Sequence, residues 1–342
     1  MKKIVIIGAG SMGSAFAVPC IENKNDVTVV GTHLEDDLIK NIKLNNQTHP
    51  ALNTQLSKEI KFEKYENLQT ILEKNPDIVV CGVSSVGIEW FVKQISKNYK
   101  KKLPIVLLTK GLSIFDNELT TLSDKIRNLL KKDGHSEINI SAIKGPCLAT
   151  GLANKMRTGT VIANLDIKES QLLKEIISTN YYSTEISEDI TGVEISGAIK
   201  NIYSMLIGAS EGLSNSKVSK DIQSKYYLNT AASLIHRSIS EMVEFVKHYG
   251  GETQTVYGLA GLGDLYVSAI GGRNSLMGKY LGEGYLYNEA KEKFMKHTTV
   301  EGAQLALEIG PKILQDLNLT NFPLMFSMLK TICENKKLEI NW

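Results

Sequence analysis

The feature that most constrains the fold is a glycine-rich turn near the start of the chain. The stretch IVIIGAGSMGSA sets Gly8, Gly10 and Gly13 in the pattern G-x-G-x-x-G directly after a short apolar run. The first glycine permits a tight turn, the second lets a pyrophosphate approach the backbone, and the third lets a helix pack on the strand. Between a strand and a helix, whose N-terminus attracts phosphate, the pattern predicts a dinucleotide-binding domain. The turn residues expected to contact the dinucleotide are Gly8, Ala9, Gly10, Ser11, Met12 and Gly13.

Strands and helices alternate over roughly the first 190 residues. Buried strands are expected at 3–7, 27–30, 78–83, 104–108, 138–143 and 160–163. Continuous apolar strands separated by helices indicate a parallel sheet that is covered on both faces. Later in the chain the strand signals stop and long amphipathic patterns follow, as in TAASLIHRSISEMVEFVKHYG. The sequence therefore predicts an α/β Rossmann-type domain over residues 1–190 and an all-α domain over residues 191–342.

The N-terminal stretch also has features of a secretory signal peptide, because two lysines precede an apolar run that contains Ala-x-Ala at 15–17. Three glycines within that run favour a strand and turn instead. No other stretch has about 18 consecutive apolar residues, so no membrane span is expected.

The four cysteines are far apart and form no C-x-x-C pair, which argues against disulfides and zinc and favours the cytoplasm.

The charge balance limits the partners that the chain can bind. Lys and Arg number 39 against 37 Asp and Glu, for a net charge of +2. So small a surplus gives no electrostatic reason to expect nucleic acid or a membrane surface as a partner. Any anionic ligand must therefore be bound by a small number of Lys or Arg side chains at its site.

A lysine stands in a helix that is otherwise apolar on almost every face. In EISGAIKN at 194–201 and the residues that follow, apolar side chains recur at helical spacing. Lys200 is the only basic residue of this helix, and a lysine is almost never fully buried without a partner. From the residues alone the role stays open: Lys200 forms a structural pair with a carboxylate, extends its amine out to solvent, or acts as a proton donor and acceptor in a partly dry site.

Two further stretches carry residues that suit a phosphorylated ligand. In LLTKGL, Lys110 follows a buried strand, at the strand end that faces the ligand crevice of open α/β sheets. The alternative is a solvated loop lysine. In GLGDLYVSAIGGRNSLMG, Arg273 stands beside Asn274. This pair suits recognition of a phosphate by several parallel hydrogen bonds. The alternative is a surface turn with a charged tip.

The second strand leaves the choice of dinucleotide open. An acidic residue about 20 positions after the turn would hold the ribose of NAD, and an arginine would accommodate the 2′-phosphate of NADP. Here Gly31, Thr32 and His33 occupy that place and Glu35 comes late, so both NAD and NADP are considered. His33 either lines the adenosine pocket or is an ordinary loop histidine. The remaining histidines, His49 among them, show no metal-ligand spacing, and no metal is expected.

In seven short motifs the chain resembles the soluble NAD(P)-dependent glycerol-3-phosphate dehydrogenases over nearly its full length. The motifs are the glycine turn, TKG at 109–111, GPCLA at 145–149, GAIKN at 197–201, GLGDL at 261–265, GGRN at 271–274 and VEG at 300–302. Their shared order and intervals make the resemblance specific. It implies a C-terminal helical architecture of the 6-phosphogluconate dehydrogenase type. It also implies hydride exchange between NAD or NADP and the pair dihydroxyacetone phosphate and sn-glycerol 3-phosphate, by a homodimer that feeds glycerophospholipid synthesis.

The same resemblance assigns roles to individual residues. Lys200 would be the catalytic proton donor and acceptor, and Lys110 would be a second cation that contacts substrate and cofactor. Lys200 and Asp264 would also contact the substrate, and a carboxylate such as Asp264 beside the lysine would fix its ammonium group. The other residues implied to bind substrate are Gly145, Cys147, Asn201, Ser268, Gly272, Arg273 and Asn274. The other residues implied to reach the cofactor are Ala149, Arg273 and Glu301.

Two positions depart from the family pattern. Cys147 stands where many bacterial members carry serine. Because a thiol is a poorer hydrogen-bond donor than a hydroxyl, phosphate binding would depend more on backbone N–H groups. The run VSSVG at 83–87 replaces a Pro-Ser-Gln run, so the loop on the nicotinamide side is expected to differ.

Two other functions fit the same architecture. A related enzyme, such as a ketopantoate or 6-phosphogluconate dehydrogenase, would act on a different phosphorylated or carboxylated alcohol, but GGRN together with GAIKN argues against it. A non-catalytic dinucleotide sensor would keep the fold, but the joint presence of Lys200, Asp264 and Arg273 favours an enzyme.

Overall fold

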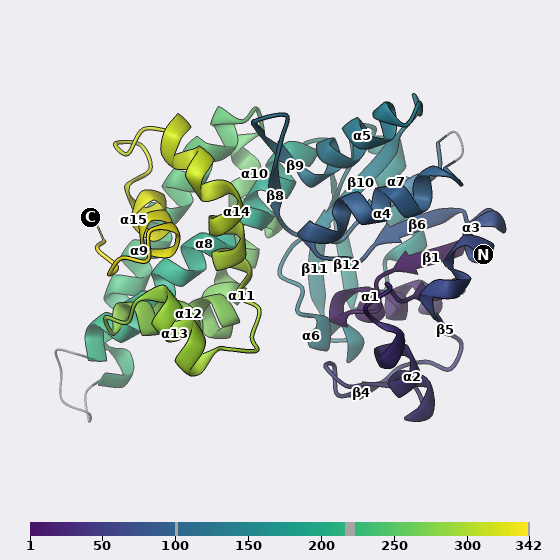
Figure 1. Cartoon of the computed structure of the whole chain (residues 1–342), viewed down its shortest axis with the longest axis horizontal. Coiled ribbons are helices and arrows are strands. Elements are labelled where there is room, and N and C mark those ends of the chain that lie inside the picture. Colours follow the sequence, from purple (N-terminus) through teal and green to yellow (C-terminus); the bar gives the residue numbers. More distant parts are fainter. Residues whose placement is uncertain (100–101, 216–222, 341–342) are drawn as a thin grey trace. The chain divides into compact units, whose positions relative to one another are not determined.

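The computed structural model describes residues 1–99, 102–215 and 223–340. The chain forms two compact units, residues 1–110 with 121–190 and residues 111–120 with 191–342, whose elements are labelled in Figure 1. The chain passes for the last time from one unit to the other after residue 190. Residues 111–120, which the sequence assigned to the first domain, belong to the second unit.

The first unit is built around an eight-stranded sheet. In sheet order its strands are β12 (Tyr182–Ser187), β11 (Thr158–Ala163), β10 (Asn139–Lys144), β7 (Pro104–Leu107), β6 (Ile78–Cys81), β1 (Lys3–Ile7), β2 (Asp26–Val30) and β5 (Lys61–Glu63). The strands from β10 to β5 are parallel, as the alternation of apolar strands and helices predicts. The strand order reverses at β1, the place where open α/β sheets bind their ligands.

One edge of the sheet departs from the parallel arrangement, because β11 runs antiparallel to β10. The helix between them, α6 (Ala149–Ala153), has five residues and is about 7.5 Å long. A parallel crossover would have to return along a six-residue strand of about 20 Å. The chain therefore turns back directly into β11. The last strand, β12, pairs in parallel with β11, and its alternating sequence YSTEIS gave no apolar run to predict it.

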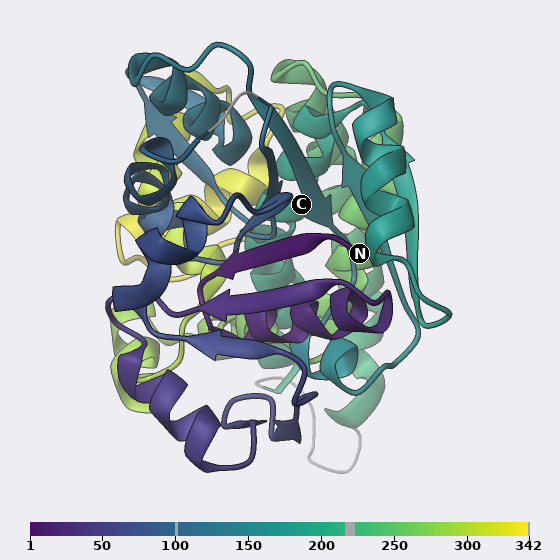
Figure 2. The same ribbon diagram turned by 90° about the vertical axis from the view of Figure 1, so that its right-hand side faces the viewer.

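Alternate residues of the strands face two layers of helices. Ile4 and Ile6 of β1 pack in one hydrophobic cluster with α1 (Ser11–Glu22), α2 (Asp36–Leu44), α6 and α7 (Ile167–Ile177). Val5 and Ile7 pack in another with α3 (Leu68–Glu73), α4 (Ile88–Ser96) and α5 (Leu122–Lys132). Figure 2 shows β1, β2 and β5 side by side with α1 along them. The unit also contains the hairpin of β3 (Thr48–His49) and β4 (Thr54–Gln55) and the short helices η1 (Tyr65–Asn67) and η2 (Ser85–Gly87).

In its described residues the second unit is helical apart from the hairpin of β8 (Leu112–Phe115) and β9 (Glu118–Thr121). Its helices are α8 (Ile190–Asn215), α9 (Gln223–His248), α10 (Thr253–Tyr257), the π-helical turn η3 (Leu259–Gly263), α11 (Asp264–Gly271), α12 (Arg273–Gly282), α13 (Tyr287–Phe294), α14 (Glu301–Asp316) and α15 (Pro323–Cys333). One hydrophobic core joins these helices, with Ile199 and Leu206 of α8 fully buried in it. Across the described ranges, every helix is too short or too polar to span a membrane.

Candidate active site

The glycine turn joins β1 to α1 by contacts of backbone on backbone. Gly8 has a φ of +111°, and a Cβ there would lie 2.7 Å from the carbonyl carbon and oxygen of Gly82. A Cβ on Gly13 would lie 2.2 Å from the carbonyl oxygen of Gly8. Both positions therefore require glycine for the structural reasons that the pattern predicts. Gly82 directly follows β6. It was not singled out from the sequence, although a glycine near the end of a buried strand could have indicated a close backbone contact there.

Gly10 differs from the other two glycines because the protein leaves space beside it. A Cβ there would meet only Oε1 of Glu35, at an ordinary contact distance of 3.8 Å. Gly10 is also the N-cap of α1, and as a glycine it has no side chain with which to cap this helix. The first N–H groups of α1, at Ser11 and Met12, are thus not used by a capping side chain. This open backbone fits the pyrophosphate of a dinucleotide.

Glu35 lies beyond the end of β2, yet its carboxylate reaches back to the glycine turn. Its Oε2 accepts hydrogen bonds from the N–H of Ala9 at 3.1 Å and from the N–H of Thr32 at 2.8 Å. The late position of Glu35 in the sequence therefore does not keep it away from the turn. His33 is exposed, and its ring centroid lies 5.4 Å from that of Trp90. His33 is thus accessible for the adenosine role that the sequence left open.

Two lysines follow neighbouring parallel strands. Lys110 comes after β7 and is half-buried, and its Nζ donates to the carbonyl oxygen of Gly145 at 3.3 Å. Lys144 ends β10 and is buried, and its Nζ donates to the carbonyl oxygens of Leu107 at 3.2 Å and Thr109 at 2.9 Å. Lys144 was not predicted as a site residue, although it carries the same signal as Lys110, a lysine at the end of a buried strand. Its ammonium group fixes the backbone that leads into Lys110.

The GPCLA segment brings its predicted residues to the same strand ends. Cys147 and Ala149 are half-buried and pack against the hydrophobic cluster that contains α1. Cys147 also lines a small hollow together with Met12, Lys110 and Gly145. Within the first unit, residues predicted to contact substrate and cofactor therefore share one surface region.

In the second unit, Lys200 of α8 is buried against a carboxylate. Its Nζ lies 2.7 Å from Oδ1 of Asp264 and also forms a hydrogen bond with Oγ of Ser268. The side chains of Lys200 and Asp264 are only 4% and 3% exposed. Asp264 and Ser268 stand four residues apart on α11, so both face Lys200 from the same side of that helix. The carboxylate explains how α8 tolerates a buried lysine, and it holds the amine at a defined point.

A chain of hydrogen bonds starts at the residue beside Lys200. Oδ1 of Asn201 accepts from Nδ2 of Asn274 at 2.9 Å, and Oδ1 of Asn274 accepts from the N–H of Gly302 at 2.8 Å. Both asparagine side chains are buried. The bonds tie α8 to the first turns of α12 and α14, so the predicted substrate residues Asn201 and Asn274 form one network with the backbone of Gly302. Gly302 was quoted in the VEG motif but was not predicted as a site residue.

Arg273 and Glu301 stand at the first positions of α12 and α14 and form an ion pair. A guanidinium nitrogen of Arg273 lies 2.9 Å from Oε1 of Glu301, and the two side chains remain 55% and 46% exposed. Gly272 and Val300 are the N-caps of the two helices, and neither of these two residues caps its helix through a side chain, although Oδ1 of Asn274 accepts from the N–H of Gly302 in the first turn of α14. The exposed guanidinium and the start of α12 can therefore attract a phosphate from solution.

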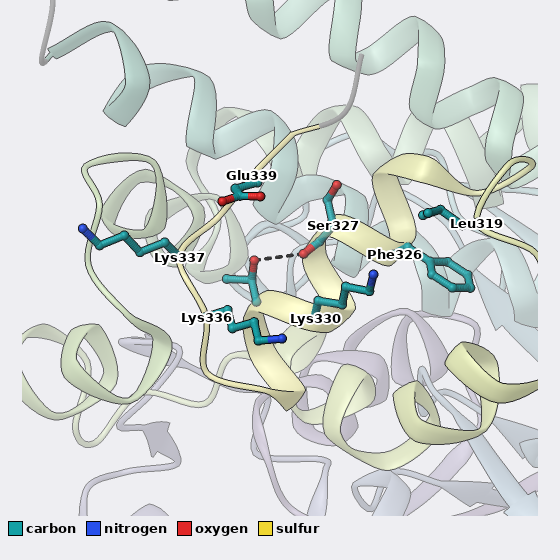
Figure 3. Close-up of a pocket in the computed structure, with 8 residues that line it drawn as sticks. Leu319, Phe326, Ser327, Lys330, Lys336, Lys337 and Glu339 are labelled. Atoms are coloured by element: carbon teal, nitrogen blue, oxygen red, sulfur yellow. Dashed lines mark hydrogen bonds between the residues drawn. The ribbon is translucent and has the colours of Figure 1, made fainter.

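A hollow of about 320 Å³ lies in another part of the second unit (Figure 3). Its walls come from α15 and the chain that follows, with Phe326, Lys330, Lys336, Lys337 and Glu339 among the lining residues. The residues predicted to bind substrate or cofactor do not line it. The hollow is therefore separate from the candidate active site.

Two family models match the chain, one for each half of a known enzyme. The N-terminus of NAD-dependent glycerol-3-phosphate dehydrogenase matches residues 3–170, and its C-terminus matches residues 189–341. The chain belongs to the NAD-dependent glycerol-3-phosphate dehydrogenase family.

Relatives of this glycerol-3-phosphate dehydrogenase family member span almost its whole length. The NADP(+)-dependent glycerol-3-phosphate dehydrogenase of Archaeoglobus fulgidus is 34% identical over 98% of this chain and 96% of the relative. The glycerol-3-phosphate dehydrogenase (NAD(P)+) of Mesoplasma florum is 31% identical over 96% and 93%. The crystal structure of glycerol-3-phosphate dehydrogenase from Coxiella burnetii is similar with a TM-score of 0.81 at 25% identity, covering 98% of this chain and 96% of that one. The family and the fold class predicted from the motifs are thus confirmed.

Within this glycerol-3-phosphate dehydrogenase family member, the predicted site residues fall into two groups, one in each unit. The group of the first unit is Gly8, Ala9, Gly10, Ser11, Met12, Gly13, His33, Lys110, Gly145, Cys147 and Ala149. The group of the second unit is Lys200, Asn201, Asp264, Ser268, Gly272, Arg273, Asn274 and Glu301. Among the described residues, no cluster of three or more His, Cys, Asp and Glu side chains could hold a metal ion.

Proposed function

We propose that this protein interconverts dihydroxyacetone phosphate and sn-glycerol 3-phosphate by hydride transfer with NAD or NADP, with Lys200 as proton donor and acceptor. The buried amine of Lys200, held by Asp264 and Ser268, is the observation that carries the proposal. The names of the relatives that are 34% and 31% identical support the substrate pair.

The proton chemistry follows from the position of the amine. Reduction adds a hydride to C2 of the ketone and leaves an electron pair on the oxygen, which then needs a proton. The ammonium group of Lys200 gives that proton when its Nζ lies within about 2.6–3.2 Å of the oxygen. In the oxidation direction the neutral amine takes the hydroxyl proton as the hydride leaves carbon. The buried carboxylate of Asp264 favours the ammonium form, which assists proton uptake in the oxidation direction, and it holds the amine in place for both directions.

The glycine turn is the proposed site of the dinucleotide, which supplies or accepts the hydride when bound. The open space beside Gly10 and the uncapped start of α1 support this placement. By family likeness, the further cofactor contacts are His33, Lys110, Ala149, Arg273 and Glu301.

The substrate phosphate and hydroxyls need donors, and the second unit supplies several. Arg273 offers an exposed guanidinium, and Asn201 and Asn274 offer amides whose orientation the network fixes. Gly272 contributes its backbone at the start of α12. By family likeness, Lys110, Gly145 and Cys147 are also proposed to bind substrate, and Lys110 to act in catalysis as a second cation.

Substitution of Lys200 tests the proposed proton transfer. In Lys200→Met we expect kcat for dihydroxyacetone phosphate, followed by NADH or NADPH absorbance, to fall by about 10²–10⁴-fold. The dissociation constant for the dinucleotide should be unchanged. Lys200→Arg keeps the charge beside Asp264 but has no amine that can lose its proton, so it should be similarly inactive.

Lys279→Met is the matched control, because it also removes an ion-paired lysine from the second unit. Nζ of Lys279 lies 2.6 Å from Oε1 of Glu211, and this carboxylate raises the pKa of Lys279. This control should keep the wild-type kcat. Full activity of Lys200→Met, or no turnover by the unchanged protein with either dinucleotide, would contradict the proposal.

We further infer that the protein is a cytoplasmic homodimer whose product feeds glycerophospholipid synthesis, with no nucleic-acid partner. Family likeness supports the dimer and the role. The four cysteines are far apart in the sequence and form no C-x-x-C pair, which supports a reducing compartment. The net charge of +2 supports the absence of nucleic acid. Light scattering of the purified protein tests the dimer, and a monomer mass would contradict it.

A further inference from the structure

The backbone of Ala9, in the middle of the glycine turn, is held from three directions. Its N–H donates to Glu35, and its carbonyl oxygen accepts from Oγ of Ser14 at 2.8 Å. Nε2 of His49 lies 3.0 Å from the same carbonyl oxygen. Ala9 is 0% exposed and His49 is 1% exposed, so these bonds are shielded from water. His49 is 40 residues away along the chain, and the fold alone brings it here.

The hydrogen bonds of His49 define its tautomer. The N–H of Leu52 donates to Nδ1 at 3.3 Å, so Nδ1 carries no proton. Nε2 therefore carries the ring proton and donates it to the carbonyl oxygen of Ala9. In this way the imidazole connects the hairpin of β3 and β4 to the glycine turn.

Holding the Ala9 carbonyl also fixes the direction of the next N–H. The described chain has no cis peptide bond, so the carbonyl of Ala9 and the N–H of Gly10 point to opposite sides of one plane. His49 and Ser14 hold the carbonyl on the buried side. The N–H of Gly10 must then point to the opposite side of the peptide plane, away from His49 and Ser14. A separate observation leaves room for a ligand at this residue, because a Cβ on Gly10 would meet only Oε1 of Glu35.

We propose that His49 is a positioning residue for dinucleotide binding, which aims the N–H of Gly10 at the pyrophosphate by holding the carbonyl of Ala9. The inference rests on the proposed placement of the dinucleotide at the glycine turn. When the donor from His49 is lost, Ser14 alone holds the carbonyl and the peptide plane can tilt. The N–H of Gly10 then forms a weaker hydrogen bond with the pyrophosphate.

Two substitutions of His49 separate this role from simple anchoring of the hairpin. His49→Gln places an amide N–H near the position of Nε2, so it keeps a donor for Ala9 and loses the acceptor for Leu52. His49→Asn places an acceptor near the position of Nδ1, so it keeps the bond to Leu52 and loses the donor for Ala9. Dissociation constants for NADH and NADPH are measured by fluorescence titration of the full-length proteins, with thermal unfolding of each variant alongside.

We expect the dissociation constant to rise about tenfold in His49→Asn, which corresponds to about 1.4 kcal/mol, and to stay near the wild-type value in His49→Gln. The rise should be equal for NADH and NADPH because both carry the same pyrophosphate. His135→Asn is the matched control, since Nε2 of His135 lies 3.2 Å from Oγ of Ser96 in the same unit and that bond is also lost. The control should bind both dinucleotides as the wild type does.

A variant of the turn itself distinguishes failure of this inference from failure of the proposed site. If Gly10→Ala weakens binding while His49→Asn and His49→Gln bind equally well, His49 only anchors the hairpin and the inference is wrong. If Gly10→Ala binds as the wild type does, the dinucleotide does not lie at the turn, and both proposals fail. Should His49→Asn not fold, Ser14→Ala removes the other donor to the same carbonyl, and an unchanged dissociation constant there overturns the inference.

Discussion

Lys200 shows how much of a site a single residue can reveal before its partner is known. Its place in an apolar helix predicts a partner, because a buried lysine needs one. The partner, Asp264, lies 64 residues away on another helix, and the sequence alone leads to it only through the family motif. Breaking a buried pair of this kind costs about 3–5 kcal/mol, so variants of either residue need a stability measurement beside the activity.

Gly10 gives the clearest single-residue test of where the dinucleotide binds. Gly10→Ala has room in the protein, so its unfolding temperature should stay near the wild-type value while the dissociation constant for NADH rises at least tenfold through crowding of the pyrophosphate. Gly8→Ala would instead be strained by its φ of +111° and by contact with Gly82, and should lose stability itself. Titration and thermal unfolding of both variants check the contrast, and equal stability losses would contradict it.

The residues that sequence reasoning missed share a physical cause. Glu35 and His49 contact Ala9 across 26 and 40 residues, and their partner atoms belong to the backbone. A backbone group has no residue type that a pattern can detect, so only the fold shows these bonds. Lys144 also binds backbone carbonyls, but its position at the end of a buried strand gave a signal that could have been used.

Between α8 and α12, glycines allow the two helices to approach until backbone meets backbone. A Cβ on Gly278 would lie 1.8 Å from the carbonyl oxygen of Met205, and one on Gly208 would lie 2.2 Å from that of Ser275. Both contacts are shorter than any side chain permits. The close approach brings Asn201 of α8 within hydrogen-bond reach of Asn274 of α12.

Gly278→Ala should therefore act on both stability and catalysis. We expect a loss of about 1–3 kcal/mol or more in the free energy of unfolding, because α12 must move away from α8. KM for the substrate should rise as the Asn201–Asn274 bond lengthens. Gly151→Ala in α6 is the matched control, since a Cβ there meets only Met156 at 3.9 Å. Denaturant unfolding checks both, and equal stability of the two variants would contradict the prediction.

Glu241 of α9 joins three helices through one buried carboxylate. It accepts from the N–H groups of Leu324 at 2.7 Å and Met325 at 2.9 Å, at the start of α15, and from the hydroxyl of Tyr203 in α8 at 3.1 Å. Burial outweighs these bonds and raises the pKa of Glu241 above its ordinary 4.5. The folded state thus binds the proton more tightly than the unfolded state.

The free energy of unfolding should therefore fall as pH rises from 4.5 through the raised pKa of Glu241. Glu241→Gln carries no titrating group at this position, so the stability difference between wild type and variant should grow in favour of the wild type as pH falls from 8 towards 5. Denaturant unfolding at several pH values measures this difference. Parallel stability curves would show that the carboxylate does not titrate in this range.

The elements that sequence reasoning located best are those whose burial is continuous. The strands β6 and β7 are apolar along their whole length, and β1 is apolar after its first residue, Lys3. The predicted ends of all three agree with the structure to within two residues. The strand β12 alternates buried and exposed residues with polar types, and the hairpin of β8 and β9 is too short to show a period. Strands that are short, or that mix polar and apolar residues, form because neighbouring strands and helices supply their hydrogen bonds and packing. Their own sequences therefore did not predict them.

For the whole molecule, the main difference from the expected organisation is the segment 111–120. It leaves the first unit after Lys110 and contributes the buried side chain of Leu112 to the core of the second unit. β8 lies against α14 in that core. The second unit is therefore discontinuous in sequence, which composition and periodicity gave no means to foresee.

Leu112→Ala tests whether the hairpin belongs energetically to the helical unit. Removal of a buried leucine side chain should lower the free energy of unfolding by about 2–5 kcal/mol and speed proteolytic cleavage within residues 191–342. Leu319→Ala is the control, because Leu319 is 42% exposed and its loss should cost less than about 0.5 kcal/mol. Cleavage confined to residues 1–110 would contradict the assignment.

Because the second unit is discontinuous in sequence, a chimera of two family members preserves both units only when its junctions match their boundaries. A chimera joined once, at residue 190, would combine the hairpin of one parent with the helical core of the other, and Leu112 would meet foreign neighbours. Recombination that keeps each unit intact needs three junctions, after residues 110, 120 and 190. The first of these junctions directly follows Lys110. A chimera that takes the whole second unit, hairpin included, from another family member is therefore joined next to Lys110, a residue of the proposed active site.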